Sequence, residues 1–234
     1  MAKNIPLNER IIFALDVPNA NEAKKWVETL EVHTRFFKVG LQLFLAAGFE
    51  IIDWMLNRHL KVFVDLKFFD VPETVKLAVE ALSERAVTFA TVHGNDAMLK
   101  AAVEAAQEIK ILAVTALTSL DEADMRDLGF SCSVADLVLS RARRALEIGC
   151  SGVVSSGLEA SMLRENLGGN FLVVVPGIRP AKNVDDQKRT VDVIQAFQNG
   201  ADYIVVGRPV RDAPDPHTAM TNMQIQIESV VRNL

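Results

Sequence analysis

The chain has 234 residues, half of them hydrophobic, and a formal net charge of −5. This length suits one large domain with a sizeable buried core, so we expect residues 1–234 to form a single domain. The acidic balance excludes a generic attraction for nucleic acid or for an anionic membrane, and any basic site for an anionic ligand must therefore be local.

The N-terminus and the cysteines indicate a cytoplasmic protein. Residues 1–10 are polar and lack the apolar segment of a signal peptide, and no apolar run approaches the length that spans a bilayer. Cys132 and Cys150 have neither metal-binding nor redox spacing, and the four histidines form no HxxxH or HxH pair. We therefore expect no metal site and no membrane partner.

Short β-branched apolar segments alternate with longer amphipathic segments along the chain. The predicted strands cover residues 11–17, 36–40, 61–67, 89–94, 111–117, 152–156, 171–178 and 203–208. Each segment is strand-length and almost continuously apolar, as is typical of parallel strands that are buried on both faces.

The amphipathic segments between these strands predict helices. They cover residues 22–30, 44–58, 73–85, 96–108, 133–148, 158–166, 190–199 and 217–231. Asn19 or Asn21 can cap the first helix, Pro72 suits the first turn of the third, and Gly149 suits the end of the fifth. Eight strand–helix units favour an α/β fold of the (β/α)8 TIM barrel type over an open doubly wound sheet.

The third predicted strand becomes charged at its carboxyl end, where the chemistry of a barrel of this kind lies. Asp65 and Lys67 share parity and leave the strand on one face, and Asp70 follows in the loop. Because buried ion pairs rarely improve stability, a functional role is favoured over a structural ion pair. Neighbouring carboxylates favour the ammonium form of a lysine, which suits a proton donor and does not suit a Schiff-base lysine.

Two further strand ends can extend this charged cluster. Lys38 ends the second predicted strand and can act as a second cation. Asp16 ends the first, where a loop or capping aspartate and an acceptor for a hydroxyl or ribose are equally plausible roles. Two acids and two lysines are together close to neutral. Such an array could protonate a developing carbanion, or hold a substrate anion beside Asp65, where like charges repel.

Gly-Arg segments mark the ends of the last two strands. PGIRP at residues 176–180 contains Arg179, and VGRP at residues 206–209 contains Gly207 and Arg208. The loops after strands seven and eight form the usual phosphate site of a TIM barrel, where glycine admits the anion to backbone N–H groups and arginine binds it with a fork. The alternative is a pair of turn glycines with solvated arginines. The polar residues 181–189 predict a solvated loop, or a lid in which Gln187 supplies an amide donor.

Together these segments resemble the orotidine 5′-monophosphate decarboxylase family. The matching segments are FALD at 13–16, FKVG at 37–40, DLKFFDVPET at 65–74, AVTALTS at 113–119, PGIRP at 176–180, DQ at 186–187 and VVGR at 205–208. They extend over nearly the whole chain, and the D-x-K-x-x-D pattern with an upstream lysine is the specific part. Phe69 and Gly94 depart from the family's pattern, in which many members have histidine and alanine there.

The resemblance implies a cofactor-free and metal-free decarboxylation of orotidine 5′-phosphate to UMP, a step of pyrimidine biosynthesis. It assigns Lys67 as the proton donor to the pyrimidine carbon that loses CO2, with Lys38 and Asp65 around it. It also implies a homodimer with shared active sites, to which the partner contributes Asp70 and Thr74. The implied substrate contacts are Asp16 and Lys38 at the ribose, Thr118 near the pyrimidine, and Arg179, Gln187, Gly207 and Arg208 at the phosphate.

Two alternatives stay open. An enzyme resembling 3-keto-L-gulonate 6-phosphate decarboxylase or hexulose-phosphate synthase would share the D-x-K-x-x-D pattern and the phosphate loops. Those relatives use Mg²⁺ with an acidic residue where this chain has Lys38, whose charge would repel a metal. The second alternative is a barrel that senses a nucleotide phosphate without turnover, but binding alone needs no lysine between two carboxylates.

Overall fold

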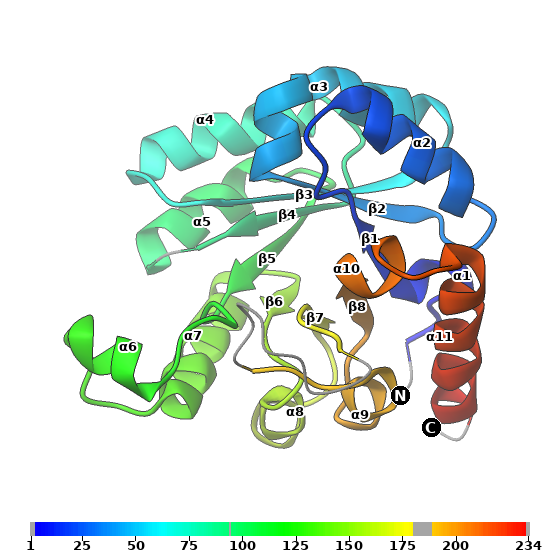
Figure 1. The fold of residues 1–234 in the computed structure, drawn as a ribbon. Coiled ribbons are helices and arrows are strands. Elements are labelled where there is room, and N and C mark those ends of the chain that lie inside the picture. The colour runs from blue at the N-terminus through cyan, green and yellow to red at the C-terminus, as the bar shows by residue number, and fades with distance from the viewer. Residues whose placement is uncertain (1–2, 94, 180–188, 233–234) are drawn as a thin grey trace.

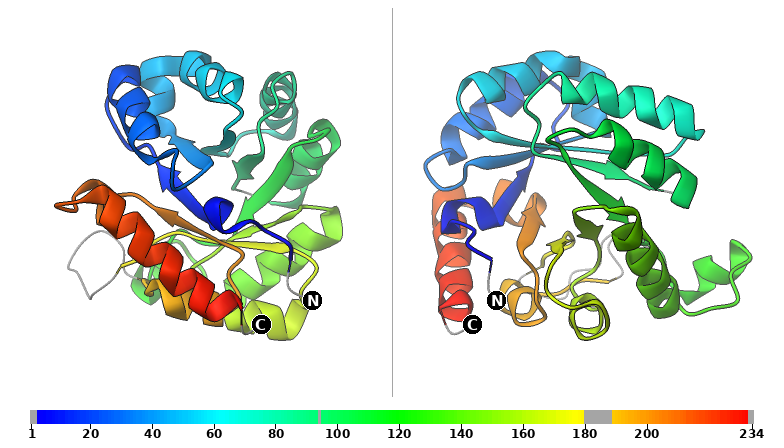
Figure 2. Two further views of the ribbon diagram at one scale, coloured as in Figure 1. Left: turned by 90° about the vertical axis from the view of Figure 1, so that its right-hand side faces the viewer. Right: turned by 180° about the vertical axis from the view of Figure 1, so that it is seen from behind.

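The computed structural model describes residues 3–93, 95–179 and 189–232. Strands and helices alternate along these ranges, and the helices surround the strands (Figures 1 and 2). The strands are β1 (Ile11–Ala14), β2 (Phe36–Gly40), β3 (Lys61–Phe68), β4 (Phe89–Val92), β5 (Lys110–Val114), β6 (Gly152–Val154), β7 (Leu172–Val175) and β8 (Tyr203–Val206).

These strands form a closed parallel barrel in sequence order. Closure is made by β1, which pairs with β2 through Ile12 and Phe36 and with β8 through Phe13 and Val206. Every strand therefore has two neighbours, and the sheet has no free edge. The predicted (β/α)8 barrel is confirmed. Six of the eight strands end two or three residues earlier than the apolar pattern indicates, because the chain leaves the barrel there to form the loops of its upper rim.

The helices connect successive strands and cover the outside of the barrel. They are α1 (Leu7–Arg10), α2 (Ala20–Leu30), α3 (Leu41–Asn57), α4 (Pro72–Ser83), α5 (Asp96–Ala105), α6 (Glu122–Asp127), α7 (Val134–Ile148), α8 (Ala160–Leu167), α9 (Val193–Gln198), α10 (Arg208–Arg211) and α11 (Pro216–Val231). The short helices α1, α6 and α10 were not predicted, since four to six residues are too few to show a helical period. In Figures 1 and 2, α6 stands away from the barrel.

Local signals explain where several helices begin and end. The Asn19 side chain accepts a hydrogen bond of 2.9 Å from the backbone N–H of Glu22 and caps α2, which settles the choice between the two asparagines. Ser133 caps α7, and Gly149 ends it with a left-handed φ of 105°, a conformation that glycine adopts without a steric penalty. Within the described ranges, no helix is long and apolar enough to cross a membrane.

Side chains fill the inside of the barrel. One cluster of buried residues gathers there, and Phe36, Phe89 and Tyr203 form an aromatic layer with ring centroids 5.0 to 5.8 Å apart. The alternate residues of the same strands, such as Phe13 and Phe37, point outward and pack against the helices. The barrel is thus a packed core. The cluster inside the barrel supports the mouth of the barrel, which is the rim formed by the carboxyl ends of the strands, where polar residues gather.

Candidate active site

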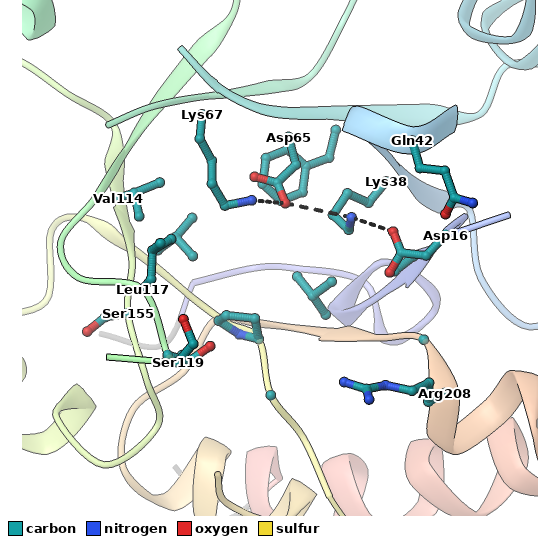
Figure 3. A pocket seen from close by; sticks show the side chains of 18 of the residues that line it. Asp16, Lys38, Gln42, Asp65, Lys67, Val114, Leu117, Ser119, Ser155 and Arg208 are labelled. Atoms are coloured by element: carbon teal, nitrogen blue, oxygen red, sulfur yellow. Dashed lines mark hydrogen bonds and ion pairs between the residues drawn. The ribbon is translucent and has the colours of Figure 1, made fainter. Parts of the chain in front are cut away.

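A cavity of about 480 Å³ opens among the loops at the carboxyl ends of the strands (Figure 3). Its lining comes from the ends of β1, β2, β3, β5, β6, β7 and β8. The residues are Ala14, Asp16, Lys38, Gln42, Phe63, Asp65, Lys67, Val114, Ala116, Leu117, Thr118, Ser119, Val154, Ser155, Pro176, Gly177, Arg179, Val205, Gly207, Arg208 and Arg211. A cavity of this size accommodates a small organic ligand.

Four charged side chains of alternating sign form a row along one wall of this cavity (Figure 3). Lys67 Nζ lies 2.9 Å from Asp65 Oδ2, and Lys38 Nζ lies 3.7 Å from the same oxygen. Lys38 Nζ also donates a hydrogen bond of 3.0 Å to Asp16 Oδ1. The predicted cluster of Asp16, Lys38, Asp65 and Lys67 is therefore formed by one chain, from the ends of three neighbouring strands.

An irregular strand end brings Lys67 to Asp65. The pairing of β3 with β4 changes register between Val64 and Phe68, and Lys67 has a left-handed φ of 50°, which is uncommon for a residue with a Cβ. Thr91 on β4 stabilises this bend: its hydroxyl accepts from Lys67 N at 2.9 Å and donates to Asp65 Oδ1 at 2.9 Å. The contact between Lys67 and Asp65 therefore depends on this bend as well as on the two side chains leaving the strand on the same face.

The charges in the row determine one another's protonation. Burial alone would raise the pKa of Asp65, but the charges of Lys38 and Lys67, with hydrogen bonds from Lys67 and Thr91, hold that pKa below its usual value. Burial alone would lower the pKa of Lys38, but Asp65 and Asp16 outweigh it and raise that pKa. Both groups thus stay charged at neutral pH, so a buried carboxylate is fixed between two ammonium groups.

Arginines that follow β7 and β8 also line the cavity. Arg208 lies across the cavity from the charged row (Figure 3), directly after Gly207 at the end of β8. Arg179, which follows β7, is buried, and its Nη1 donates 2.8 Å to the carbonyl of Ile178. The cavity thus has a cationic end, suited to an anion, and a charged row at the opposite wall.

A family model described as "Orotidine 5'-phosphate decarboxylase / HUMPS family" matches residues 9–223. The chain belongs to this family. The resemblance inferred from the sequence motifs is therefore confirmed, and the matched range takes in every strand of the barrel and the whole cavity.

Relatives in this family cover almost the full chain. The chain is 59% identical over 231 residues to an orotidine 5'-phosphate decarboxylase of Methylococcus capsulatus, an alignment that covers 97% of this chain and 96% of that protein. A protein of the same name from Stenotrophomonas maltophilia is 45% identical over 96% of this chain and 95% of its own length. The crystal structure of orotidine 5'-phosphate decarboxylase from Lactobacillus acidophilus superposes with a TM-score of 0.82 at 36% identity, covering 94% and 99% of the two chains. The chain is a decarboxylase, as predicted.

Two predicted site residues of this family member lie outside the cavity. Asp70 and Thr74 are exposed, and the Asp70 carboxylate accepts a 2.7 Å hydrogen bond from the neighbouring backbone N–H of Val71. Neither residue lines the cavity of its own chain. Gln187 and Gly94 lie outside the described residues, whereas Thr118 is buried and lines the cavity.

Several residues around the cavity escaped the sequence analysis. Thr91 lies inside an apolar strand, where a threonine gives no functional signal. Gln42 lies in the first turn of α3, and Arg211 is the last residue of the short helix α10. Arg211 Nη1 donates 3.0 Å to the backbone carbonyl of Asp16, which joins the loop after β8 to the loop after β1. Within the described ranges, no group of three His, Cys, Asp or Glu side chains could hold a metal ion.

Proposed function

We propose that this chain converts orotidine 5′-monophosphate to UMP in pyrimidine biosynthesis, as a single-domain cytoplasmic enzyme that uses neither cofactor nor metal ion. The observation that carries the proposal is the row Lys67–Asp65–Lys38–Asp16 facing a cationic pocket across one cavity. The row supplies a proton donor beside a fixed negative charge. The far end supplies arginines for an anion.

In the proposed complex, the substrate spans the cavity from the arginines to the row. Arg208 and Arg179, with the backbone at Gly207 and the Gln187 amide, hold the phosphate. Asp16 and Lys38 contact the ribose hydroxyls, and Thr118 lies near the pyrimidine. The substrate carboxylate then lies beside Asp65, where two negative charges repel each other.

The proposed chemical step breaks the bond between the pyrimidine ring and the carboxylate carbon. CO2 leaves without the bonding electron pair, which stays on the ring carbon as a carbanion, and Lys67 donates a proton to that carbon. Among the described residues, the Lys67 ammonium has one hydrogen-bond acceptor, Asp65, so further N–H groups are available for the substrate. The Lys67 ammonium and Lys38 also stabilise the developing negative charge.

Asp70 and Thr74 are proposed to complete the active site of a second copy of the chain. Both are exposed on the segment that follows Lys67. Large apolar side chains on this segment and on the neighbouring helix α3 are also exposed, as is typical of a protein interface. They are Leu41, Leu45, Phe69, Val71 and Leu77. A symmetric dimer through this surface would exchange the two segments reciprocally.

One assay tests the proposed function: the loss of orotidine 5′-monophosphate followed by ultraviolet absorbance, before and after exhaustive dialysis against EDTA. Full activity in the chelated enzyme is expected, because Lys38 occupies the strand end where a metal-dependent relative would place an acidic ligand. No turnover of this substrate refutes the proposal, and turnover that disappears with EDTA and returns with Mg²⁺ favours the gulonate-phosphate type of enzyme.

A further inference from the structure

A second ion pair lies beneath the rim of the cavity, and the proposed chemistry does not use it. Arg189 and Glu159 are both buried, and Arg189 Nη1 lies 2.6 Å from Glu159 Oε1. Glu159 follows β6 and precedes α8, whereas Arg189 belongs to the connection between β7 and α9. The ion pair therefore joins the loops after two neighbouring strands.

Arg189 also binds a third loop, the one after β5. Its Nη2 donates 2.9 Å to the carbonyl of Leu117 and 3.4 Å to that of Ala116, and its backbone N–H donates 3.3 Å to the carbonyl of Thr118. Ser156 Oγ donates 3.2 Å to the carbonyl of Arg189 in turn. One side chain and its backbone thus fix three successive peptide units of this loop.

These peptide units belong to the wall of the cavity. Ala116, Leu117 and Thr118 all line it, and Figure 3 shows Leu117 and Ser119 on one side of the cavity. In the proposed complex this loop faces the pyrimidine through Thr118. Arg189 itself does not line the cavity, so its influence on the substrate is indirect, and the cavity-lining residues to which it hydrogen-bonds are Ala116, Leu117 and Thr118.

The chemistry of the ion pair argues against stability as its main role. Within the described part of the chain, Arg189 Nε and Glu159 Oε2 are buried without a hydrogen-bond partner. A buried ion pair with unsatisfied polar atoms gains less from its mutual attraction than it loses by desolvation, and apolar residues of similar size often replace such pairs without loss of stability. What apolar residues could not replace is the donation of hydrogen bonds to the two carbonyls.

We infer that Arg189, oriented by Glu159, is a positioning residue that holds the loop of residues 116–119 against the pyrimidine end of the substrate. This inference rests on the proposed function. It predicts that loss of the guanidinium impairs turnover even when the protein is fully stable. A misplacement of about 1 Å at a reacting centre costs about 100-fold in rate.

The experiment compares Arg189→Met with the double variant Glu159→Met/Arg189→Met. The single variant leaves the Glu159 carboxylate buried without its cation, so it should lose both stability and activity. The double variant has no buried charge at this position and should regain the wild-type urea midpoint. Its kcat should stay about 100-fold low, because the carbonyls of Ala116 and Leu117 still lack their donor. Recovery of both stability and kcat would overturn the inference.

Two further variants keep the test decisive if the double variant does not fold. Arg189→Lys retains the charge beside Glu159 but not the planar fork, so a stable protein with reduced kcat is expected. Arg164→Met is the matched control. Arg164 also pairs with a carboxylate, Asp202, and donates to the carbonyls of Gly200 and Phe171, but at the opposite end of the barrel. Its loss should lower stability and leave kcat unchanged. Arg189→Lys with wild-type kcat would overturn the inference.

Inhibition by inorganic phosphate separates the two ends of the cavity. The inhibition constant should be the same in wild type and Arg189→Lys, because the variant acts at the pyrimidine end. If the inhibition constant of Arg189→Lys rose by as large a factor as kcat fell, the variant would act at the phosphate end, and the positioning role at the pyrimidine end would be overturned. If wild-type enzyme does not turn over orotidine 5′-monophosphate, the proposed function fails. If wild type is active and the variants match it, only the positioning role fails.

Discussion

The two ends of the barrel use the same ion-pair chemistry in different ways. At the amino-terminal ends of the strands, the buried Asp202 accepts hydrogen bonds from Lys3 at 2.9 and 2.8 Å, from Arg164 at 2.8 Å and from the backbone N–H of Val173 at 2.9 Å. At the mouth, Asp65 is likewise paired with two cations and receives one neutral hydrogen bond.

The difference lies in what else the cations bind. Arg164 also donates to the carbonyls of Gly200 and Phe171, so most of its hydrogen-bonding capacity is used by the chain itself. Lys67 is one-third exposed toward the cavity and has only Asp65 as an acceptor among the described residues. Ion pairs whose donors do not face a cavity stabilise the fold, whereas a pair with unused donors that face a cavity is suited to act on a ligand.

The largest effect is expected from two separate variants, each of which removes a cation from one end of the barrel. Lys67→Ala should lower kcat by about 1,000-fold or more with the fold intact, because the proton donor is lost while Asp65 keeps Lys38 and Thr91 as partners. Lys3→Ala, at the other end, should lower the free energy of unfolding and leave kcat unchanged. Steady-state kinetics and urea unfolding of both variants measure the contrast.

A Lys67→Ala protein that keeps most of its kcat would contradict the mechanism. A Lys3→Ala protein that folds normally but loses kcat as strongly as Lys67→Ala would contradict the division of roles between the two ends of the barrel.

The next effect concerns the cationic end of the cavity. Arg208→Ala should lower kcat/KM by about 100-fold, since each hydrogen bond to a charged group contributes about 1.5–3 kcal/mol. Orotidine without its phosphate should be a very poor substrate for wild type, because binding energy from the phosphate is used at the distant reacting centre. For this truncated substrate, Arg208→Ala and wild type should be equally slow. Similar kcat/KM values for orotidine and its phosphate would exclude this use of binding energy.

A smaller effect tests whether the mouth is completed by a second chain. Lys67→Ala and Asp70→Asn, each inactive alone, are unfolded and refolded together in equal amounts. Half of the dimers are then mixed, and one of their two sites combines intact Lys67 with the partner's intact Asp70, so roughly a quarter of wild-type activity should return. Activity that stays at the level of the parents, with mixed dimers confirmed by mass, would rule out the shared site.

The sequence was sufficient to predict the barrel and most of its mouth. Parallel strands of a closed barrel all end at one rim, so the end of each apolar run locates a side chain there, and Asp16, Lys38, Asp65 and Lys67 were found in this way. The position of Asp70 could not be predicted from one chain in the same way, because the residues that face it are proposed to belong to another copy.

The supporting residues were beyond sequence analysis for a physical reason. Arg189 ends a polar run that predicts a solvated loop, and Glu159 lies at the start of an ordinary amphipathic helix. Nothing in either local pattern indicates burial, because long side chains become buried only when three loops from distant parts of the chain meet. Thr91 is similar: its hydroxyl gains a role only through the bend of the neighbouring strand at Lys67.

The smallest predicted effect is the dependence of stability on pH that arises from the charged row. The pKa of Asp65 is lowered in the folded protein, so its ion pairs stabilise the fold above its unfolded pKa of about 4, and this contribution is lost as the pH falls through the folded pKa. The pKa of Lys38 is raised, so its contribution is present below about pH 10.4 and is lost only as the pH rises through its folded pKa. Asp65→Asn should therefore be less stable than wild type at neutral pH. The difference should shrink as the pH falls below about 4, because the unfolded wild-type chain then takes up a proton that the folded protein binds less readily. Urea unfolding of both proteins at pH 7, 4 and 3 measures this. A difference that stays constant over this range would show that Asp65 is not held as a carboxylate by Lys38 and Lys67.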